Sequence, residues 1–395
     1  MREKIGIKGG SKVDVMERRV ELELDGIIKS MASNQPPAPT SPPPPRTYAP
    51  VPCIPPFCTF ECAPLPPPST CSSKYGPSPP PPPPPHLRCP SGNVHPISIS
   101  IPSTTIVPCV PLKDPSSKIA VQSSSGPYKF TSNEEHSYKA SYRASYHGLT
   151  RKKSGCDCLR HYEILSQGSV PFFTDGFEDC TDIVMVHFPK EVVNDSKPRD
   201  DMSDEEYYCR VDYLLNVTRS SLTTVSAAKQ VLETAGKEDV MKVLFLGGNE
   251  GVDYVRDSLL HGFKVLMRER GGEVVDFVRP GHMYLKDFKG RNEELYGLGY
   301  TYSHWIESWG DDVYRGNIKE RLEQREFDLV VFGSVYRGMP FWEEVREHYG
   351  KEEIVLVDGE DEHGRGKEEL WGEGWFFMRE ISEEVVNTEG CEIIR

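Results

Sequence analysis

The distribution of proline limits what this chain can fold into more than any other feature of its sequence. Thirty of the 35 prolines lie between Pro36 and Pro127. Proline fixes φ, lacks a backbone N–H and disfavours helix at the residue before it. A stretch so rich in proline and so poor in large apolar residues does not bury enough surface to offset the entropy lost on ordering. We therefore predict that residues 36–127 are disordered and that the folded part begins near Tyr128.

The N-terminal third contains two local patterns. Residues 14–31, within an N-terminal segment 1–35, are expected to form one short amphipathic helix. The run Pro79–Pro85, followed by Arg88, is typical of a polyproline II helix. Such a helix is either a ligand for an SH3 or WW module or a semi-rigid spacer, and both readings stay open.

Charge divides the chain near the same position. Residues 1–130 have a net charge of +5, and the remainder has a net charge of −19. An acidic folded part argues against nucleic acid as the main partner, because binding the phosphate backbone requires a basic face. The N-terminus has no apolar core of a secretory signal, and no apolar run of 18 residues occurs. We therefore expect no membrane span and a cytoplasmic location.

The 11 cysteines do not follow a recognised zinc-binding spacing. Neither Cys58-x3-Cys62 nor Cys156-x-Cys158 has the second pair that zinc ribbons contain. The odd number of cysteines and the lack of a secretory signal favour reduced thiols. For the same reason we interpret the glycosylation sequons that begin at Asn194 and Asn216 as chance matches.

The pattern after residue 239 indicates an α/β fold. Near-continuous apolar runs alternate with helical segments, which is typical of a parallel sheet covered on both faces. We predict a Rossmann-like doubly wound parallel sheet over residues 239–395, preceded by a partial second α/β half over residues 128–238. The strands are expected at 169–175, 181–189, 242–248, 272–278, 327–334 and 352–360, and the helices at 136–149, 156–168, 203–217, 222–236, 251–270, 317–326 and 340–350.

Glycine and charged residues follow several of the predicted strands. Ligands of such sheets bind beyond the carboxyl ends of the strands. Gly247 and Gly248 lack the full G-x-G-x-x-G spacing, but backbone amides there can hold an anion. Arg337 can meet a phosphate or a carboxylate through two hydrogen bonds. The alternative is that these residues form solvated loops.

The densest acidic cluster follows the last predicted strand. Asp358, Glu360, Asp361, Glu362 and His363 lie within six positions. The carboxylate oxygens suit Mg²⁺ or Ca²⁺, and a transferase could use Mg²⁺ or Mn²⁺. Glu360, Asp361 or His363 could serve as a general base. The alternative is a solvated turn.

A recognisable sequence motif lies in SYHGLTRKKSGCDCLRHYEILSQGSVPFF (145–173). It resembles glycosyltransferase-like proteins of large viruses, algae and marine microbes, in which a G-x-D-C-x-R-H-Y-E-I-L-x-x-G-x-x-P-x-F pattern occurs. Further pieces that resemble this group continue to the end of the chain. The matching residues are Gly155, Asp157, Cys158, Arg160, His161, Tyr162, Glu163, Ile164, Leu165, Gly168, Pro171 and Phe173.

The resemblance implies a transferase with two Rossmann-like halves that binds a nucleotide sugar. Glu163 would then accept the ribose hydroxyls, and Gly168 and Pro171 would shape the loop. The phosphate-binding candidates would be Arg151, Lys152, Lys153 and Arg160. The alternative is that 156–168 is an amphipathic core helix, with Leu159, Tyr162, Ile164 and Leu165 inside and its charges in water.

One departure from the family pattern bears on activity, since the half before residue 239 lacks its first strands and helices. The leading hypothesis is transfer of a sugar from a nucleotide donor to an unknown acceptor, and a truncated donor half implies weak or lost activity. The second hypothesis is a non-catalytic binding or scaffold protein with a degenerate transferase fold and a polyproline arm. An NAD(P)-dependent oxidoreductase is disfavoured by the incomplete glycine fingerprint.

Overall fold

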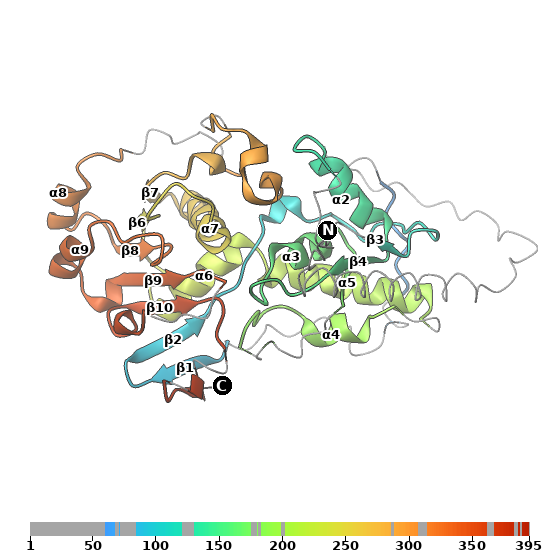
Figure 1. The fold of residues 1–395 in the computed structure, drawn as a ribbon, viewed down its shortest axis with the longest axis horizontal. Helices are drawn as coiled ribbons and strands as arrows, with labels where there is room; N and C mark the ends of the chain where they lie inside the picture. Colours follow the sequence, from blue (N-terminus) through green and yellow to red (C-terminus); the bar gives the residue numbers. More distant parts are fainter. Residues whose placement is uncertain are drawn as a thin grey trace, which may run out of the picture.

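The protein is a mixed α/β protein whose central sheet is mostly parallel (Figure 1). The structure is a computed structural model. It describes residues 60–67, 71, 84–120, 130–174, 180, 183–198, 202–285, 288–306, 314–361, 367–382, 386–387 and 389–394. The predicted helix over residues 14–31 and most of the run Pro79–Pro85 lie outside these ranges.

The large sheet has eight strands, and six consecutive ones, from β2 to the edge strand β7, run parallel. Two further strands, β1 and β11, extend it in antiparallel fashion at one edge. In spatial order the strands are β11 (Glu392–Ile394), β1 (His86–Cys89), β2 (Gly92–Pro96), β10 (Trp375–Met378), β9 (Ile354–Asp358), β8 (Leu329–Phe332), β6 (Lys242–Leu246) and β7 (Glu273–Phe277).

The strands predicted at 242–248, 272–278, 327–334 and 352–360 are confirmed as β6, β7, β8 and β9. All residues of β8 and β9 are buried, as expected for strands whose two faces are both covered. Strand β10 has an apolar sequence, WFFM, but was not predicted.

Helices cover both faces of the large sheet. Helices α6 (Thr224–Ala235) and α7 (Tyr254–Arg270) pack together on one side. Helices α8 (Ile318–Glu323) and α9 (Trp342–His348) lie on the other side (Figure 1). Right-handed crossovers produce this arrangement, because β7 and β8 lie on opposite sides of β6.

A smaller sheet lies beside the large one and consists of β3 (Ile119–Ala120), β4 (His147–Thr150) and β5 (Val170–Phe173). Its strands are all parallel. The helices around it are α2 (Glu135–Ala144), α3 (Leu159–Ser166), α4 (Lys190–Asp195) and α5 (Asp204–Ser221). Short 3₁₀ helices lie at η2 (Ser103–Thr105), η3 (Gly281–Met283), η4 (Asn292–Glu294), η5 (Tyr296–Gly299), η6 (Lys351–Glu353) and η7 (Glu368–Leu370).

Two local predictions for this part of the chain are wrong. The described residues of the strand expected at 181–189 form turns, because no neighbouring strand pairs with them. The helix expected over 136–149 ends at Ala144, and residues 147–150 instead form β4, which pairs with β5. The helix over 203–217 begins as predicted, since the Ser203 side chain accepts a hydrogen bond from the Glu206 N–H.

The prediction that residues 36–127 are disordered is wrong for residues 84–120. Strands β1 and β2 from this stretch complete the large sheet, and β3 belongs to the small one. The prolines here lie mostly between or at the ends of strands, where no ladder hydrogen bond is lost. Most of the apolar residues between them are buried, namely Leu87, Val94, Ile97, Ile99, Ile101, Ile106, Val107 and Val110.

The two sheets are joined by chain segments that cross between them. Ile101, just after β2, and Thr223, just before α6, form a parallel bridge. The bridge leads into α6, which packs against α7, and α7 packs against β7 of the large sheet. Among the described helices, none has the length and apolar character needed to cross a membrane.

The prediction of reduced thiols is wrong in this structure, because eight cysteines form four disulfides. The bonds are Cys62–Cys109, Cys71–Cys209, Cys89–Cys391 and Cys156–Cys180. Their partners are up to 302 residues apart, and spacing alone does not reveal such pairing. Of the cysteines that the structure describes, Cys158 is free.

Candidate functional site

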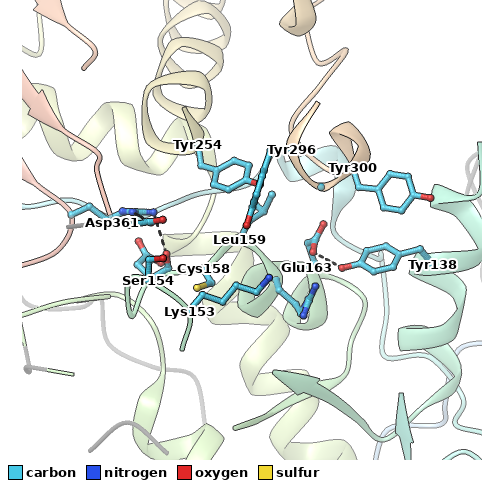
Figure 2. A pocket seen from close by; sticks show the side chains of 14 residues that line it. Tyr138, Lys153, Ser154, Cys158, Leu159, Glu163, Tyr254, Tyr296, Tyr300 and Asp361 are labelled. Carbon is cyan, nitrogen blue, oxygen red and sulfur yellow. Dashed lines mark hydrogen bonds and ion pairs between the residues drawn. The ribbon is translucent and has the colours of Figure 1, made fainter. Parts of the chain in front are cut away.

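A cavity of about 110 Å³ lies where the small-sheet part meets the large-sheet part (Figure 2). Several regions of the chain meet there: α2, α3 with the residues before it, the N-terminus of α7, the 3₁₀ turn η5 with Tyr300 after it, and the residues that follow β9 and β10. Its lining residues are Tyr138, Lys153, Ser154, Asp157, Cys158, Leu159, Arg160, Glu163, Tyr254, Tyr296, Gly297, Tyr300, Asp361 and Arg379. We refer to it below as the central cavity.

Glu163 is the buried carboxylate of the central cavity. Its side chain accepts a hydrogen bond of 2.6 Å from the Tyr138 hydroxyl (Figure 2). Burial is the largest influence on this group and raises the pKa of Glu163 above its ordinary value. The alternative that the charges of this helix all point to water is therefore wrong for Glu163, which is 5% exposed.

Three cationic side chains line the same cavity. Lys153 and Arg160 come from the segment that the sequence predicted to bind phosphate. The third, Arg379, was missed because it follows β10, which was not predicted. The apolar run WFFM, which ends at Met378, could have predicted this strand. Arg379 would then have been a candidate, because ligands bind beyond the carboxyl ends of such strands.

Arg379 connects the two parts of the structure at the cavity. Its guanidinium donates to the Asp157 backbone carbonyl at 3.2 Å and also pairs with the Asp361 carboxylate. The neighbouring Glu380 accepts hydrogen bonds from the Cys156 and Asp157 N–H groups, at 3.1 and 2.8 Å. The residues before α3 are thus held against the carboxyl ends of β9 and β10.

Asp157 is a second buried carboxylate at this junction. It accepts hydrogen bonds from the Ile99 N–H at 2.7 Å and from the Tyr162 hydroxyl at 2.5 Å. Burial raises the pKa of Asp157 to about 7, although the nearby Arg379 opposes the shift. Because its oxygen atoms are used inside the protein, Asp157 acts mainly in holding the cavity wall.

Several residues predicted to bind the nucleotide do not line the central cavity. Gly168 ends α3 with a φ of 68°, and a Cβ there would lie 2.5 Å from Pro111. Pro171 is a buried residue of β5 that pairs with Gly148. Both therefore shape the elements behind Glu163. Lys152 and Arg151 are half-buried neighbours of Lys153 outside the lining.

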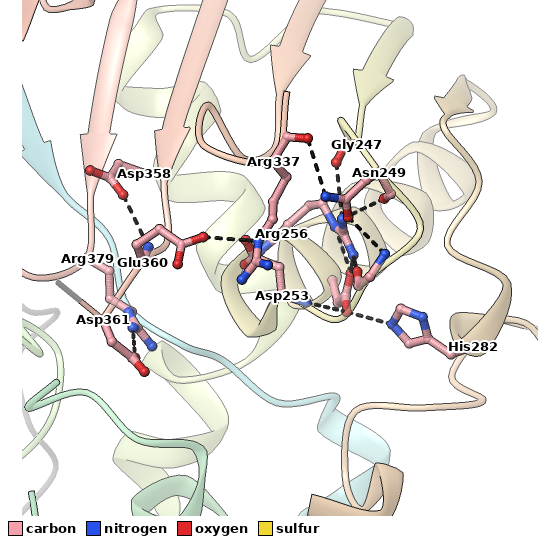
Figure 3. A network of polar contacts seen from close by, with 12 residues as sticks. Gly247, Asn249, Asp253, Arg256, His282, Arg337, Asp358, Glu360, Asp361 and Arg379 are labelled. Carbon is pink, nitrogen blue, oxygen red and sulfur yellow. Dashed lines mark hydrogen bonds and ion pairs between the residues drawn. The ribbon is translucent and has the colours of Figure 1, made fainter. Parts of the chain in front are cut away.

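The loop that contains Gly247 and Gly248 is held by a buried arginine (Figure 3). The Arg256 guanidinium is fully buried and donates to the carbonyls of Gly247, Asn249 and Gly251. It also pairs with Asp257, which contacts His282 at 2.7 Å. These buried partners keep Arg256 in place and, through it, the course of the loop.

The glycines of this loop permit a close approach between two strand ends. A Cβ on Gly248, whose φ is 75°, would lie 2.7 Å from the backbone of Arg337 and Gly338. The N–H groups of Gly247 and Asn249 donate to backbone carbonyls. Neither Gly247 nor Gly248 lines the central cavity, so the structure separates them from Glu163.

The predicted acidic cluster is divided between two environments. Asp361 lines the central cavity, and its side chain is 54% exposed. Glu360 instead forms an ion pair of 3.0 Å with Arg337 (Figure 3), and partial burial raises its pKa. Glu362 and His363 lie outside the described residues.

Asp358 ends β9 and is 1% exposed. Its Oδ1 accepts a hydrogen bond from the Glu360 N–H at 3.2 Å, while its Oδ2 is buried without a hydrogen-bond partner. Burial raises the pKa of Asp358 to about 7. Within the described part of the chain, no three His, Cys, Asp or Glu side chains are grouped so that they could hold a metal ion.

Comparison with known proteins adds no assignment to this geometry. No family model, no curated protein and no solved structure matches the chain.

Proposed function

We propose that the chain is a glycosyltransferase-like protein that binds a nucleotide sugar in the central cavity and transfers the sugar to an acceptor hydroxyl. The observation that carries the proposal is the convergence of Glu163, Lys153 and Arg160 with Asp361 and Arg379. Carboxylates can accept hydroxyl hydrogen bonds, and the cations balance a diphosphate. The resemblance of residues 145–173 to glycosyltransferase-like proteins, and a Rossmann-like large sheet beside a smaller α/β part, agree with this proposal.

The residues would divide the reaction as follows. Glu163 would accept the ribose hydroxyls once Tyr138 turns aside, while Lys153 and Arg160 would contact the diphosphate. Asp361 would take the proton from the acceptor hydroxyl as the sugar–phosphate bond breaks. Arg379 would keep Asp361 oriented through their ion pair. The tyrosines Tyr254 and Tyr296 offer aromatic faces for a sugar or base (Figure 2).

A Glu163→Gln substitution tests this assignment. It keeps the shape of the side chain but removes the charged acceptor, so affinity for the donor should fall about 10- to 100-fold. Isothermal titration with UDP- and GDP-sugars measures the change. Glu205→Gln, at an exposed position in the first turn of α5, is the matched control and should bind as the wild type does. Unchanged affinity in Glu163→Gln would exclude the ribose role.

One observation favours a second candidate, a non-catalytic binding or scaffold protein. All three carboxylates that line the cavity already have internal partners. Tyr138 contacts Glu163, Tyr162 contacts Asp157, and Arg379 contacts Asp361. A thermal-shift screen against nucleotide sugars, with and without Mg²⁺ or Mn²⁺, separates the candidates. Stabilisation by a donor supports the transferase. No stabilisation by any donor, together with capture of an SH3 or WW module by the proline-rich stretch, supports the scaffold.

A further inference from the structure

The four disulfides join segments that lie 24 to 302 residues apart in the sequence. Cys71 is bonded to Cys209 on α5, and Cys89 of β1 is bonded to Cys391 just before β11. Disulfides of this structural kind form and persist in oxidising compartments and are rare where glutathione keeps thiols reduced. The fold therefore indicates maturation in an oxidising lumen. This conclusion does not depend on the proposed function.

An oxidising lumen changes the meaning of the two glycosylation sequons. Asn194-Asp195-Ser196 lies at the end of α4, and Asn216-Val217-Thr218 lies on α5. Both asparagines are exposed, and both helices flank the small sheet (Figure 1). The Asn216 side-chain amide contacts Asp212 at 3.3 Å on the helix surface. Neither asparagine lines the central cavity.

The hydroxyl groups of the sequons, in contrast, are inaccessible in the folded protein. Ser196 and Thr218 are both 0% exposed. Their hydroxyls donate to the carbonyls of Val192 and Leu214, at 2.6 and 2.7 Å. Residues two apart on a helix do not face each other, so folded α5 holds Thr218 away from Asn216. An enzyme that reads asparagine and hydroxyl together must act before α5 forms.

We propose that Asn194 and Asn216 carry N-linked glycans, attached during synthesis in the lumen where the disulfides form. In the reaction, the asparagine amide nitrogen attacks the anomeric carbon of an oligosaccharide carried on a polyprenyl pyrophosphate. A carbon–nitrogen bond forms, the bond from the anomeric carbon to the pyrophosphate oxygen breaks, and the lipid pyrophosphate leaves. The amide proton passes to a base of the host transferase. No oxidant or reductant takes part in this step.

The full chain, expressed in cultured eukaryotic cells behind an added secretory leader so that it enters the lumen, provides the test. Peptide mass spectrometry after peptide N-glycosidase treatment should find Asp in place of Asn at positions 194 and 216. Asn194→Gln and Asn216→Gln should each remove one glycan, and the double substitution should remove both. Asn133→Gln is the matched control, because Asn133 is exposed but does not begin a sequon. This variant should keep both glycans.

In the same protein sample, alkylation without a reductant tests the four disulfides from which the oxidising lumen is inferred. The eight bonded cysteines should resist alkylation in denaturant until the protein is reduced, whereas Cys158 should react at once. Unmodified asparagine at 194 or 216 in the wild type overturns the assignment for that residue. Reaction of all eight cysteines before reduction overturns the oxidising lumen. Because the wild type alone gives these results, a variant that fails to fold does not weaken the test.

Discussion

The buried carboxyl of Asp358 makes the stability of the folded protein depend on pH. Its carboxyl has a pKa raised to about 7 by burial, so the folded protein holds a proton that the unfolded chain releases at a lower pH. Between about pH 4 and pH 7 the folded state therefore binds more protons than the unfolded state. Stability from this group is present at low pH and is lost as the pH rises through that window.

We expect Asp358→Asn to remove this pH dependence. The amide can keep its oxygen toward the Glu360 N–H and replaces an oxygen that has no hydrogen-bond partner. The free energy of unfolding of the wild type should fall by up to about 1.4 kcal/mol per pH unit more steeply than that of the variant. Urea denaturation at several pH values measures both slopes.

Asp239→Asn, at an exposed position just before β6, is the control and should keep the wild-type slope. An Asp358→Asn variant whose stability follows the wild-type profile would mean that Asp358 is not protonated in the folded protein near neutral pH.

At the scale of secondary structure elements, the contact between α6 and α7 depends on one glycine. Gly262 lies in the middle of α7, and a Cβ there would lie 2.0 Å from the Thr224 carbonyl oxygen of α6. Helix propensity alone would favour alanine over glycine by about 1 kcal/mol. The close approach of the two helices outweighs that preference.

Gly262→Ala should therefore destabilise the protein, by about 1–3 kcal/mol or more, because α7 must move away from α6. Gly281→Ala is the matched control, since a Cβ at Gly281 meets nothing within 4 Å, and its effect should stay within about 0.5 kcal/mol. Chemical denaturation measures both. A stabilised Gly262→Ala variant would show that α6 and α7 are farther apart than described here.

At the scale of the whole molecule, the proline-rich stretch is part of the core. Strand β2 lies between β1 and β10, and Val94 is 0% exposed there. Leu112, in the same proline-rich stretch, is 48% exposed. A linker would tolerate a charge at both positions, whereas the observed sheet tolerates it at one.

Val94→Asp should cost more than about 3 kcal/mol, because it places an unpaired carboxylate in the hydrophobic core. Leu112→Asp should change the free energy of unfolding by less than about 1 kcal/mol. Circular dichroism during thermal unfolding compares the two variants. If both variants lost little stability, and equally so, the prediction that residues 36–127 are disordered would hold for residues 84–120 as well.

The candidate site could be predicted in part. Lys153, Arg160, Glu163 and Asp361 were named from their sequence context, and all four line the central cavity. Arg379 and the tyrosines were not, because nothing near them in the sequence marks them as neighbours of α3. Gly247, Gly248 and Arg337 were expected to help bind the nucleotide sugar, but they lie near Arg256 and outside the lining of the central cavity.

The sequence by itself determined the local structure of the second half. Apolar runs specified β6, β8 and β9, Ser203 specified the start of α5, and Gly236 specified the end of α6. These signals are local, because periodicity and capping depend on residues a few positions apart. Only the tertiary structure decided that β2 joins β10, that Cys89 meets Cys391, and that Arg379 meets Asp157. Such contacts join distant segments through complementary surfaces, and no short stretch of sequence records its partner.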